Sequence, residues 1–199
     1  MKKLLIPIIA LLFSCSSTKI VSTWSEPNKQ IKISNLNKVL VIAKFKTETS
    51  NRKVEDNMVE YIGEKGIPSY NYLKSNFNKD NIEAIRTKIK NDGFDGVVTM
   101  RLIDVEQEQI SQRNDFNRYP NNYRDFNNYF YESQISYENP NYYVTTKVYT
   151  IETNVYSIKA DKIIWTALTE STDPKGVERM TSEIAKVVYN QMVKDSFVK

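Results

Sequence analysis

The chain has 199 residues, with 28 basic and 24 acidic side chains and no histidine, which gives a formal net charge of +4. This balance does not indicate a nucleic-acid partner, and we expect none. Because histidine is the commonest general base near neutral pH and the commonest metal ligand, its absence excludes serine–histidine catalysis and the usual zinc sites. Catalysis by carboxylates or lysines stays open.

The amino terminus has the layout of a secretory signal peptide. Two lysines precede a ten-residue apolar run, 4–13, and Ser14 lies immediately before Cys15. A helix that spans a bilayer needs roughly 20 apolar residues, so this run is too short to be a permanent anchor. We therefore expect residues 1–14 to be removed.

The segment Leu12-Phe13-Ser14-Cys15 resembles the lipobox of bacterial lipoproteins. In that family the cysteine thiol receives a diacylglycerol, a signal peptidase cuts before the cysteine, and the new amino terminus is acylated. Cys15 is also the only cysteine, so it cannot form an internal disulfide, and lipidation accounts for it. The alternative is an ordinary signal peptide with a chance cysteine beside the cut.

The resemblance implies a diacylglycerol and an N-acyl lipid on Cys15, and we expect no other cofactor. Residues 16–19 contain no acidic side chain of the kind that resembles an inner-membrane retention or surface-export signal. We therefore expect a lipid-anchored protein of the cell envelope, on the outer membrane and facing the periplasm.

The mature chain is expected to comprise a lipidated tether, 15–37, and a single α/β domain, 38–199. Loss of residues 1–14 removes two lysines and leaves 185 residues with a formal charge of +2. This length suits one domain with a hydrophobic core. The tether is polar, but Trp24 and Ile31 indicate that part of it docks onto the domain.

The first half of the domain begins with a strand and a helix. Residues 38–45 form a short apolar run rich in β-branched side chains, which is typical of a strand buried on both faces. Apolar residues at helical spacing predict a helix over 52–65, ended by Gly66. Residues 67–72 then predict a second, shorter strand.

A second helix and a third strand follow. Asp80 starts the helix, with Glu83 placed as in a capping box, and residues 91–93 end it. Residues 94–105 predict the third strand. The order strand–helix–strand–helix–strand favours a sheet covered by helices.

The second half of the domain predicts a hairpin and a terminal helix. Residues 143–158 are rich in Val, Thr and Tyr and predict a long strand, and 163–170 return as its partner. Trp165 is expected to be a central core residue. Asp173 and Pro174 open the last helix, because proline favours the first helical position. We therefore predict an α/β sandwich, a mixed sheet of about five strands with helices packed on it.

Several apolar patterns together resemble a family of small envelope lipoproteins of unassigned function, whose domain is similar to the amino-terminal domain of TolB. Lipoprotein activators of penicillin-binding proteins and the curli secretion lipoprotein share this architecture. The resemblance covers roughly 20–195, apart from one insertion, and implies an accessory or assembly role without catalytic residues. It is carried by Ser22-Thr23-Trp24, the strand 38–45, Gly93-Phe94-Asp95-Gly96-Val97-Val98, Asn154-Val155-Tyr156 and Ile163-Ile164-Trp165.

The insertion, at about 106–142, alternates tyrosine with asparagine and has no clear periodicity. A connection of this length is usually functional or disordered. Tyrosine offers a flat apolar face and a hydroxyl, and asparagine offers a paired donor and acceptor, so both suit contact with a protein or a glycan. A loosely packed, low-complexity insertion is the alternative. The residues expected to bind a partner are Tyr119, Tyr123, Arg124, Tyr129, Tyr131 and Tyr137.

Other acidic residues form no catalytic or metal-binding pattern. Glu106 and Glu108 lack a third ligand, Asp95 is expected to form a turn, and nothing in the spacing of Asp104 and Glu152 requires a carboxylate pair. We therefore expect no catalytic residues and no metal. The leading hypothesis is a non-enzymatic envelope lipoprotein that binds another envelope protein. A lipoprotein that binds peptidoglycan or another glycan is the alternative, and a carboxylate-dependent hydrolase is the third class.

Overall fold

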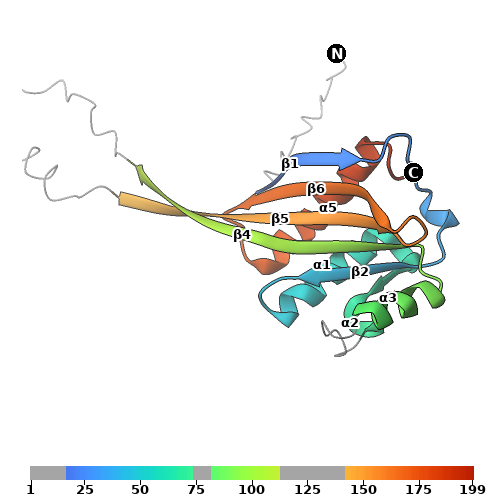
Figure 1. Cartoon of the computed structure of the whole chain (residues 1–199). Helices are drawn as coiled ribbons and strands as arrows, with labels where there is room; N and C mark the ends of the chain where they lie inside the picture. The colour runs from blue at the N-terminus through green and yellow to red at the C-terminus, as the bar shows by residue number, and fades with distance from the viewer. Residues whose placement is uncertain (1–16, 74–81, 113–141) are drawn as a thin grey trace, which may run out of the picture.

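The structure is a computed structural model that describes residues 17–73, 82–112 and 142–199. A six-stranded mixed sheet with the strand order β1-β6-β5-β4-β2-β3 packs against helices (Figure 1). This architecture confirms the α/β fold class predicted from the sequence, with one strand more than the five expected.

The described elements alternate strands and helices in the first half and end with a hairpin and a helix, as predicted. The neighbouring pairs β2–β3 and β2–β4 are parallel, and the other pairs are antiparallel. In chain order the elements are β1 (Thr18–Ser25), η1 (Ile33–Asn35), β2 (Val39–Lys44), α1 (Glu48–Ile62), η2 (Gly63–Lys65), β3 (Gly66–Pro68), α2 (Ser69–Tyr72), α3 (Ile82–Asn91), β4 (Gly96–Gln112), β5 (Tyr142–Ser157), β6 (Lys162–Thr172) and α5 (Val177–Lys194).

The additional strand is β1, which lies within residues 15–37 that the sequence analysis assigns mainly to a tether. It runs antiparallel to β6, from Thr18 opposite Ser171 to Ser25 opposite Trp165. Its Thr, Ile and Val residues favour an extended backbone. The sheet therefore includes a strand from the segment 15–37, which the sequence analysis expected to dock only in part.

The segment after β1 docks onto the domain through Ile31. Its N–H donates to the carbonyl of Phe197 at 2.6 Å, and its carbonyl accepts from the N–H of Lys199 at 3.0 Å. These bonds form an isolated parallel bridge between Ile31 and Val198. Trp24, the other residue expected to dock, is 49% exposed, so it does not hold this segment.

Helix α1 begins four residues before its predicted start and ends earlier than predicted. Thr47 caps it, because the Thr47 side-chain oxygen accepts from the N–H of Ser50 at 3.2 Å. The helix stops at Gly63, which adopts a left-handed φ of 73°. The prediction that Gly66 ends this helix was wrong by three residues.

The predicted strand over 67–72 is mostly helical, since β3 ends after three residues and α2 follows. The carboxylate of Glu55 explains this change. Glu55 is buried, and it accepts from the N–H groups of Ser69 at 2.7 Å and Tyr70 at 3.3 Å, which are the first of α2. Glu55 also accepts from the N–H of Ala43 at 2.8 Å and therefore joins α1, α2 and the end of β2.

The core has one cluster on each face of the sheet. Val41 of β2 packs with α1 and α5, whereas the preceding residue, Leu40, packs with α3 on the opposite face, because side chains alternate along a strand. Trp165 is fully buried, as predicted. Its ring lies 6.1 Å from that of Phe197, and its indole N–H donates to Asp195 at 3.1 Å.

The last helix starts later than predicted, and the start of the helix before it is not described. The described part of helix α3 begins at Ile82, and the start predicted at Asp80 lies outside the described residues and is not tested. Helix α5 begins at Val177 and not at 173–174, because Asp173 and Gly176 both adopt left-handed φ values, 41° and 90°. No helix in the described ranges is long and apolar enough to cross a membrane.

Candidate functional site

The predicted binding residues Tyr119, Tyr123, Arg124, Tyr129, Tyr131 and Tyr137 lie outside the described residues, as does Cys15. The structure nevertheless describes both ends of the insertion. Residues 106–112 belong to β4 and residue 142 belongs to β5, so the predicted boundaries of the insertion were too wide. Its flanking residues are strands because they pair with each other in continuous register.

We call the paired segments 107–112 and 142–147 the ribbon. They form six antiparallel pairs, from Gln107 opposite Lys147 to Gln112 opposite Tyr142, and extend roughly 17 Å at about 3.4 Å per residue. The pairing of β6 with β5 ends at Val148, so the ribbon has no third strand among the described residues. Figure 1 shows the ribbon leaving the body of the sheet.

Asp173 fixes the base of the ribbon. Its N–H donates to the carbonyl of Lys147 at 2.8 Å, and its carboxylate accepts from the N–H of Lys147 at 2.7 Å. Both bonds are made where β6 ends, so Asp173 supplies the partner that β6 no longer provides.

The first described residues lie at this same end of the sheet. The carbonyl of Ser17 accepts from the N–H of Thr172, beside the last pair of β5 and β6. The carboxylate of Glu183 on α5 accepts from the Ser17 N–H at 3.1 Å, the Ser17 hydroxyl at 2.9 Å and the Thr18 hydroxyl at 3.3 Å. We call this end of the domain, where Glu183 holds Ser17 and Thr18, the anchored end.

The charge of Glu183 is stabilised where the side chain meets Ser17. Burial opposes ionisation of this carboxyl group, but hydrogen bonds from Arg179, at 2.7 Å, and from Ser17 outweigh it and lower the pKa of Glu183. The ionised carboxylate therefore acts as a clamp on Ser17, two residues after Cys15.

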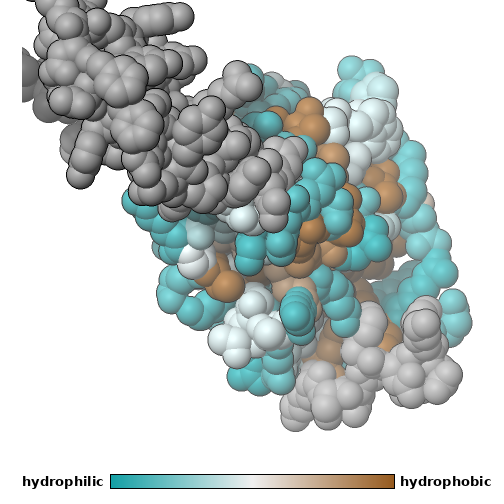
Figure 2. All heavy atoms as spheres, turned by 90° about the vertical axis from the view of Figure 1, so that its left-hand side faces the viewer, coloured by the Kyte–Doolittle hydropathy of each residue, from teal (hydrophilic) through white to brown (hydrophobic). Residues whose placement is uncertain are grey.

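Between the sheet body and the ribbon, β4 carries exposed apolar side chains. β2 pairs with β4 only as far as Arg101, so one edge of β4 beyond that residue has no strand partner among the described residues. Ile103 and Val105 lie there, and both are more than one third exposed. Figure 2, which views the molecule from this side, shows hydrophobic groups exposed between hydrophilic ones. An edge strand with apolar side chains suits pairing with another chain, although the N–H of Val105 already donates to the side chain of Asp104.

The opposite end of the sheet contains a cavity of about 260 Å³. Side chains from the sheet, from α1 and α5, and from the segment after β1 surround the cavity. We call this end of the domain the cavity end. The principal apolar lining residues are Ile33, Leu36, Val98, Val155, Met192 and Phe197.

The mouth of the cavity is basic. Lys29 is half-buried, Lys159 is exposed, and both line the cavity. In the described part of the chain, neither lysine forms an ion pair. The acidic side chain in the lining, Asp95, is engaged, since it accepts from the N–H groups of Asn37 and Lys38.

The carboxylates that the sequence analysis weighed as catalytic or metal-binding groups either bond to neighbouring groups of the fold or are exposed. Asp95 accepts from the N–H groups of Asn37 and Lys38 just before β2, so its side chain holds a distant segment and its predicted role as a turn former is not tested. Glu152 bonds to Arg101 at 3.1 Å, and Asp104 accepts from the N–H of Val105. Glu106 is exposed. No group of three potential metal ligands occurs within the described residues.

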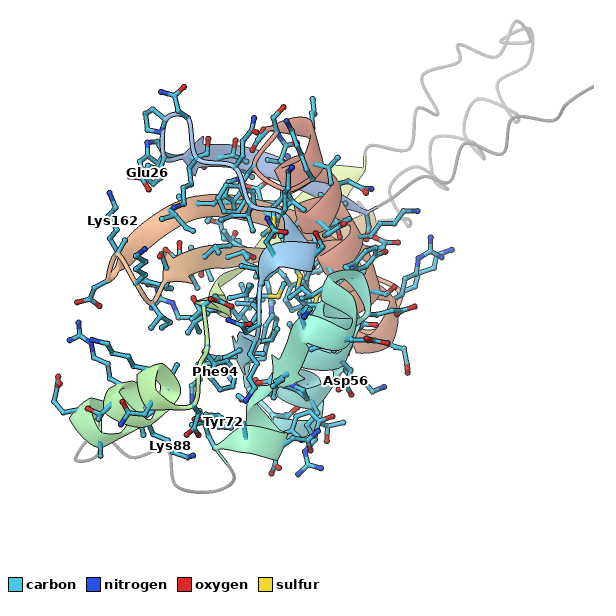
Figure 3. The ribbon with its side chains drawn as sticks, turned by 90° about the vertical axis from the view of Figure 1, so that its right-hand side faces the viewer. Glu26, Asp56, Tyr72, Lys88, Phe94 and Lys162 are labelled. Carbon is cyan, nitrogen blue, oxygen red and sulfur yellow. The ribbon has the colours of Figure 1, made fainter. Side chains whose placement is uncertain are left out.

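A cluster of ionisable groups joins α2 to the end of α3, as Figure 3 shows for Tyr72, Lys88 and Phe94. The Tyr72 hydroxyl donates to Asp92 at 2.7 Å, and Lys88 forms an ion pair with the same carboxylate. The hydrogen bond from Lys88 lowers the pKa of Asp92 and raises the pKa of Lys88. Burial, followed by the bond to Asp92, raises the pKa of Tyr72. The Tyr72 ring lies 4.7 Å from that of Phe94, so this cluster is part of the packing.

Sequence reasoning missed the clamp at Glu183 and the cavity. The clamp joins residues that are 166 positions apart, and no local pattern marks such a contact. The cavity depends on how the segment 29–36 and the carboxyl terminus meet over the sheet. The available signal was the apolar pair Ile31 and Ile33 in a polar segment, which indicates docking.

Comparison with protein families and with curated proteins finds no match. Among solved structures, the chain is similar to the PelC dodecamer from Paraburkholderia phytofirmans, with a TM-score of 0.47 and 10% identity over 86% of this chain and 95% of that chain. It is also similar to the lipoprotein GNA1162 from Neisseria meningitidis, with a TM-score of 0.41 and 9% identity over 79% of this chain and 98% of that chain. Similarities of this size carry no argument about function.

Proposed function

We propose that this chain is a non-enzymatic lipoprotein of the bacterial cell envelope, anchored through Cys15, that binds another envelope protein through the ribbon and the insertion at its tip. The observation that carries the proposal is the position of Ser17. It lies two residues after the lipobox cysteine, at the end of the sheet from which the ribbon leaves.

The anchor and the domain are therefore close together. Consecutive Cα atoms are 3.8 Å apart, so Ser17 lies at most about 7.6 Å from Cys15. A lipidated Cys15 would hold the anchored end against the lipid head groups, and the ribbon would present its partner surface near the membrane. We propose the periplasmic face of the outer membrane, because residues 16–19 lack acidic retention and export signals.

A binding role suits the chemistry of the chain better than catalysis. The chain has no histidine, and the acidic residues discussed above bond to backbone N–H groups or to arginine and lysine. Tyrosine and asparagine in the insertion offer large contact surfaces with modest loss of side-chain entropy.

Photo-cross-linking in living cells tests the partner surface. A photoreactive amino acid replaces either the exposed Gln107 of the ribbon or the exposed Lys186 of α5, and adducts are identified by mass spectrometry. We expect one envelope protein to be captured from Gln107 and not from Lys186. Cys15→Ala and a deletion of residues 110–140 should each remove this adduct.

The controls distinguish loss of the surface from loss of the fold. Far-ultraviolet circular dichroism should change little, since among the described residues the deletion removes only 110–112, at the end of β4. Unchanged capture after the deletion would overturn the assignment of the surface. If no protein is captured and the protein sediments with purified cell wall, the glycan-binding alternative replaces the proposal, because its tyrosines and asparagines suit saccharides equally well.

A further inference from the structure

We propose that the cavity end binds a single-chain amphiphile with an anionic head, such as a medium-length fatty acid. This site lies at the opposite end of the sheet from the ribbon, and it does not depend on the proposed partner. Its assignment depends on the apolar lining, the size of the cavity and the charge at its mouth.

The interior of the cavity fits an alkyl chain. Its surface is mostly apolar, with Val98 and Val155 from the sheet, Leu36 from the segment after β1 and Met192 from α5. If each methylene takes roughly 30 Å³, the share of a water molecule in the liquid, the cavity holds a chain of about nine carbons. Water would find few polar partners along these walls, so an apolar occupant is favoured.

The charge at the mouth selects the head group. Lys29 and Lys159 line the cavity without an ion pair among the described residues, and each ammonium group can donate to a carboxylate or a phosphate. The nearby acids are engaged, because Asp95 bonds to backbone N–H groups and Glu26 pairs with Lys162 (Figure 3). An anionic head therefore meets two ammonium groups against the single carboxylate of Asp95, so the charged side chains of the lining sum to +1 and favour an anionic over a cationic head.

The acyl chains expected on Cys15 are not the occupant. Strand β1 runs from the anchored end, where Thr18 lies opposite Ser171, to the cavity end, where Ser25 lies opposite Trp165. Its eight residues cover roughly 24 Å at about 3.4 Å per residue. The lipid at Cys15 is therefore separated from the cavity by the length of the sheet, and the occupant is a separate molecule.

The test uses the lipidated protein in nanodiscs of neutral phosphatidylcholine and decanoate that carries a terminal diazirine. After illumination, mass spectrometry locates the label. We expect label on peptides that contain Val98, Val155 or Met192, and we expect competition by decanoate but not by decyltrimethylammonium, which has the same chain and a cationic head. Label confined to surface peptides, or equal competition by the two heads, would overturn the proposal.

Three variants separate the cavity from its mouth. Leu36→Trp places a larger side chain in the lining and should abolish internal labelling. Lys159→Glu reverses one charge at an exposed position and should weaken competition by decanoate about fivefold, as expected for an exposed ion pair. Lys175→Glu makes the same charge change beyond the end of β6 and should leave competition unchanged.

The outcome does not depend on whether Leu36→Trp folds, because Lys159→Glu leaves the apolar part of the lining intact. Thermal unfolding followed by circular dichroism checks each variant. If Lys159→Glu and Lys175→Glu change competition equally, the charge at the mouth does not select the ligand and the proposal fails. If internal labelling persists in a folded Leu36→Trp protein, the cavity is not the site.

Discussion

The two ends of the sheet are held together by different interactions. At the anchored end, polar groups dominate: Glu183 binds Ser17, and Asp173 binds Lys147. At the cavity end, the contacts are largely apolar, with Trp165 packed on Phe197 beside the cavity. Because β1 and the sheet separate the two sets of contacts, changes at one end should leave the other end nearly unaffected. The Glu183→Gln prediction below tests that independence directly, and the other predictions measure individual contacts that hold the fold together.

The largest effect is expected from Trp165→Ala. This change removes a fully buried ring and its bond to Asp195, and it should lower the free energy of unfolding by about 3–5 kcal/mol. Trp24→Ala is the matched control, since the 49% exposed Trp24 should cost less than about 1 kcal/mol. Denaturant unfolding measures both, and similar losses would contradict the assignment of Trp165 to the core.

A smaller and more local effect is expected from Glu183→Gln. The amide cannot pair with Arg179 or carry the charge that holds Ser17, so the free energy of unfolding should fall by about 1–2 kcal/mol. Hydrogen exchange at Thr18 should accelerate, while exchange at Phe197 stays unchanged. Glu178→Gln, on the same helix with an 83% exposed side chain, should have little effect. Faster exchange at Phe197 would show that the two ends are coupled.

Asp173→Ala should weaken the base of the ribbon. The substitution removes the acceptor for the N–H of Lys147, and alanine fits the left-handed φ of 41° poorly, so the loss should be about 1 kcal/mol. Asp173→Asn keeps an acceptor and tolerates this backbone conformation, so it should retain most of the stability. Hydrogen exchange at Lys147 reports the difference, and equal exchange in the two variants would exclude a role for the side chain.

The smallest effect is a loss of stability in acid. The pKa values of Glu183 and Asp92 are lowered in the folded protein from ordinary values of 4.5 and 3.8. Their contribution is therefore complete above those ordinary values and is lost as the pH falls through the lower folded values. Thermal midpoints should be level from neutral pH to about pH 5 and should then fall. Glu183→Gln should reduce this slope, and a midpoint that rises in acid would contradict the assignment.

The strongest sequence patterns identified the elements that the core requires. The apolar run 38–45 contains β2, and the helical spacing of 177–192 corresponds to α5, because burial on a sheet needs those residues at those positions. Trp165 was identified for the same reason. Each of these predictions depends on neighbours within one element, where a single sequence is informative.

The elements that sequence analysis misplaced depend on distant partners. β1 is mostly exposed and polar, so its strand structure comes from pairing with β6, which lies about 150 residues further along the chain. The turn into α2 follows from the carboxylate of Glu55 on another helix. The contacts at both ends of the sheet also join residues that lie far apart in the sequence. For the same reason, the clamp and the cavity required the structure.

The position of β1 also determines how late in folding the sheet can be completed. The hydroxyls of Thr18 and Ser171 bond across 153 residues, so closing this pair costs more chain entropy than any hairpin in the sheet. A chain exported from its amino terminus would present β1 first and its partner strand almost last. The edge strand would therefore stay unpaired until synthesis is nearly finished, and its exposed backbone would need protection from other chains during that interval.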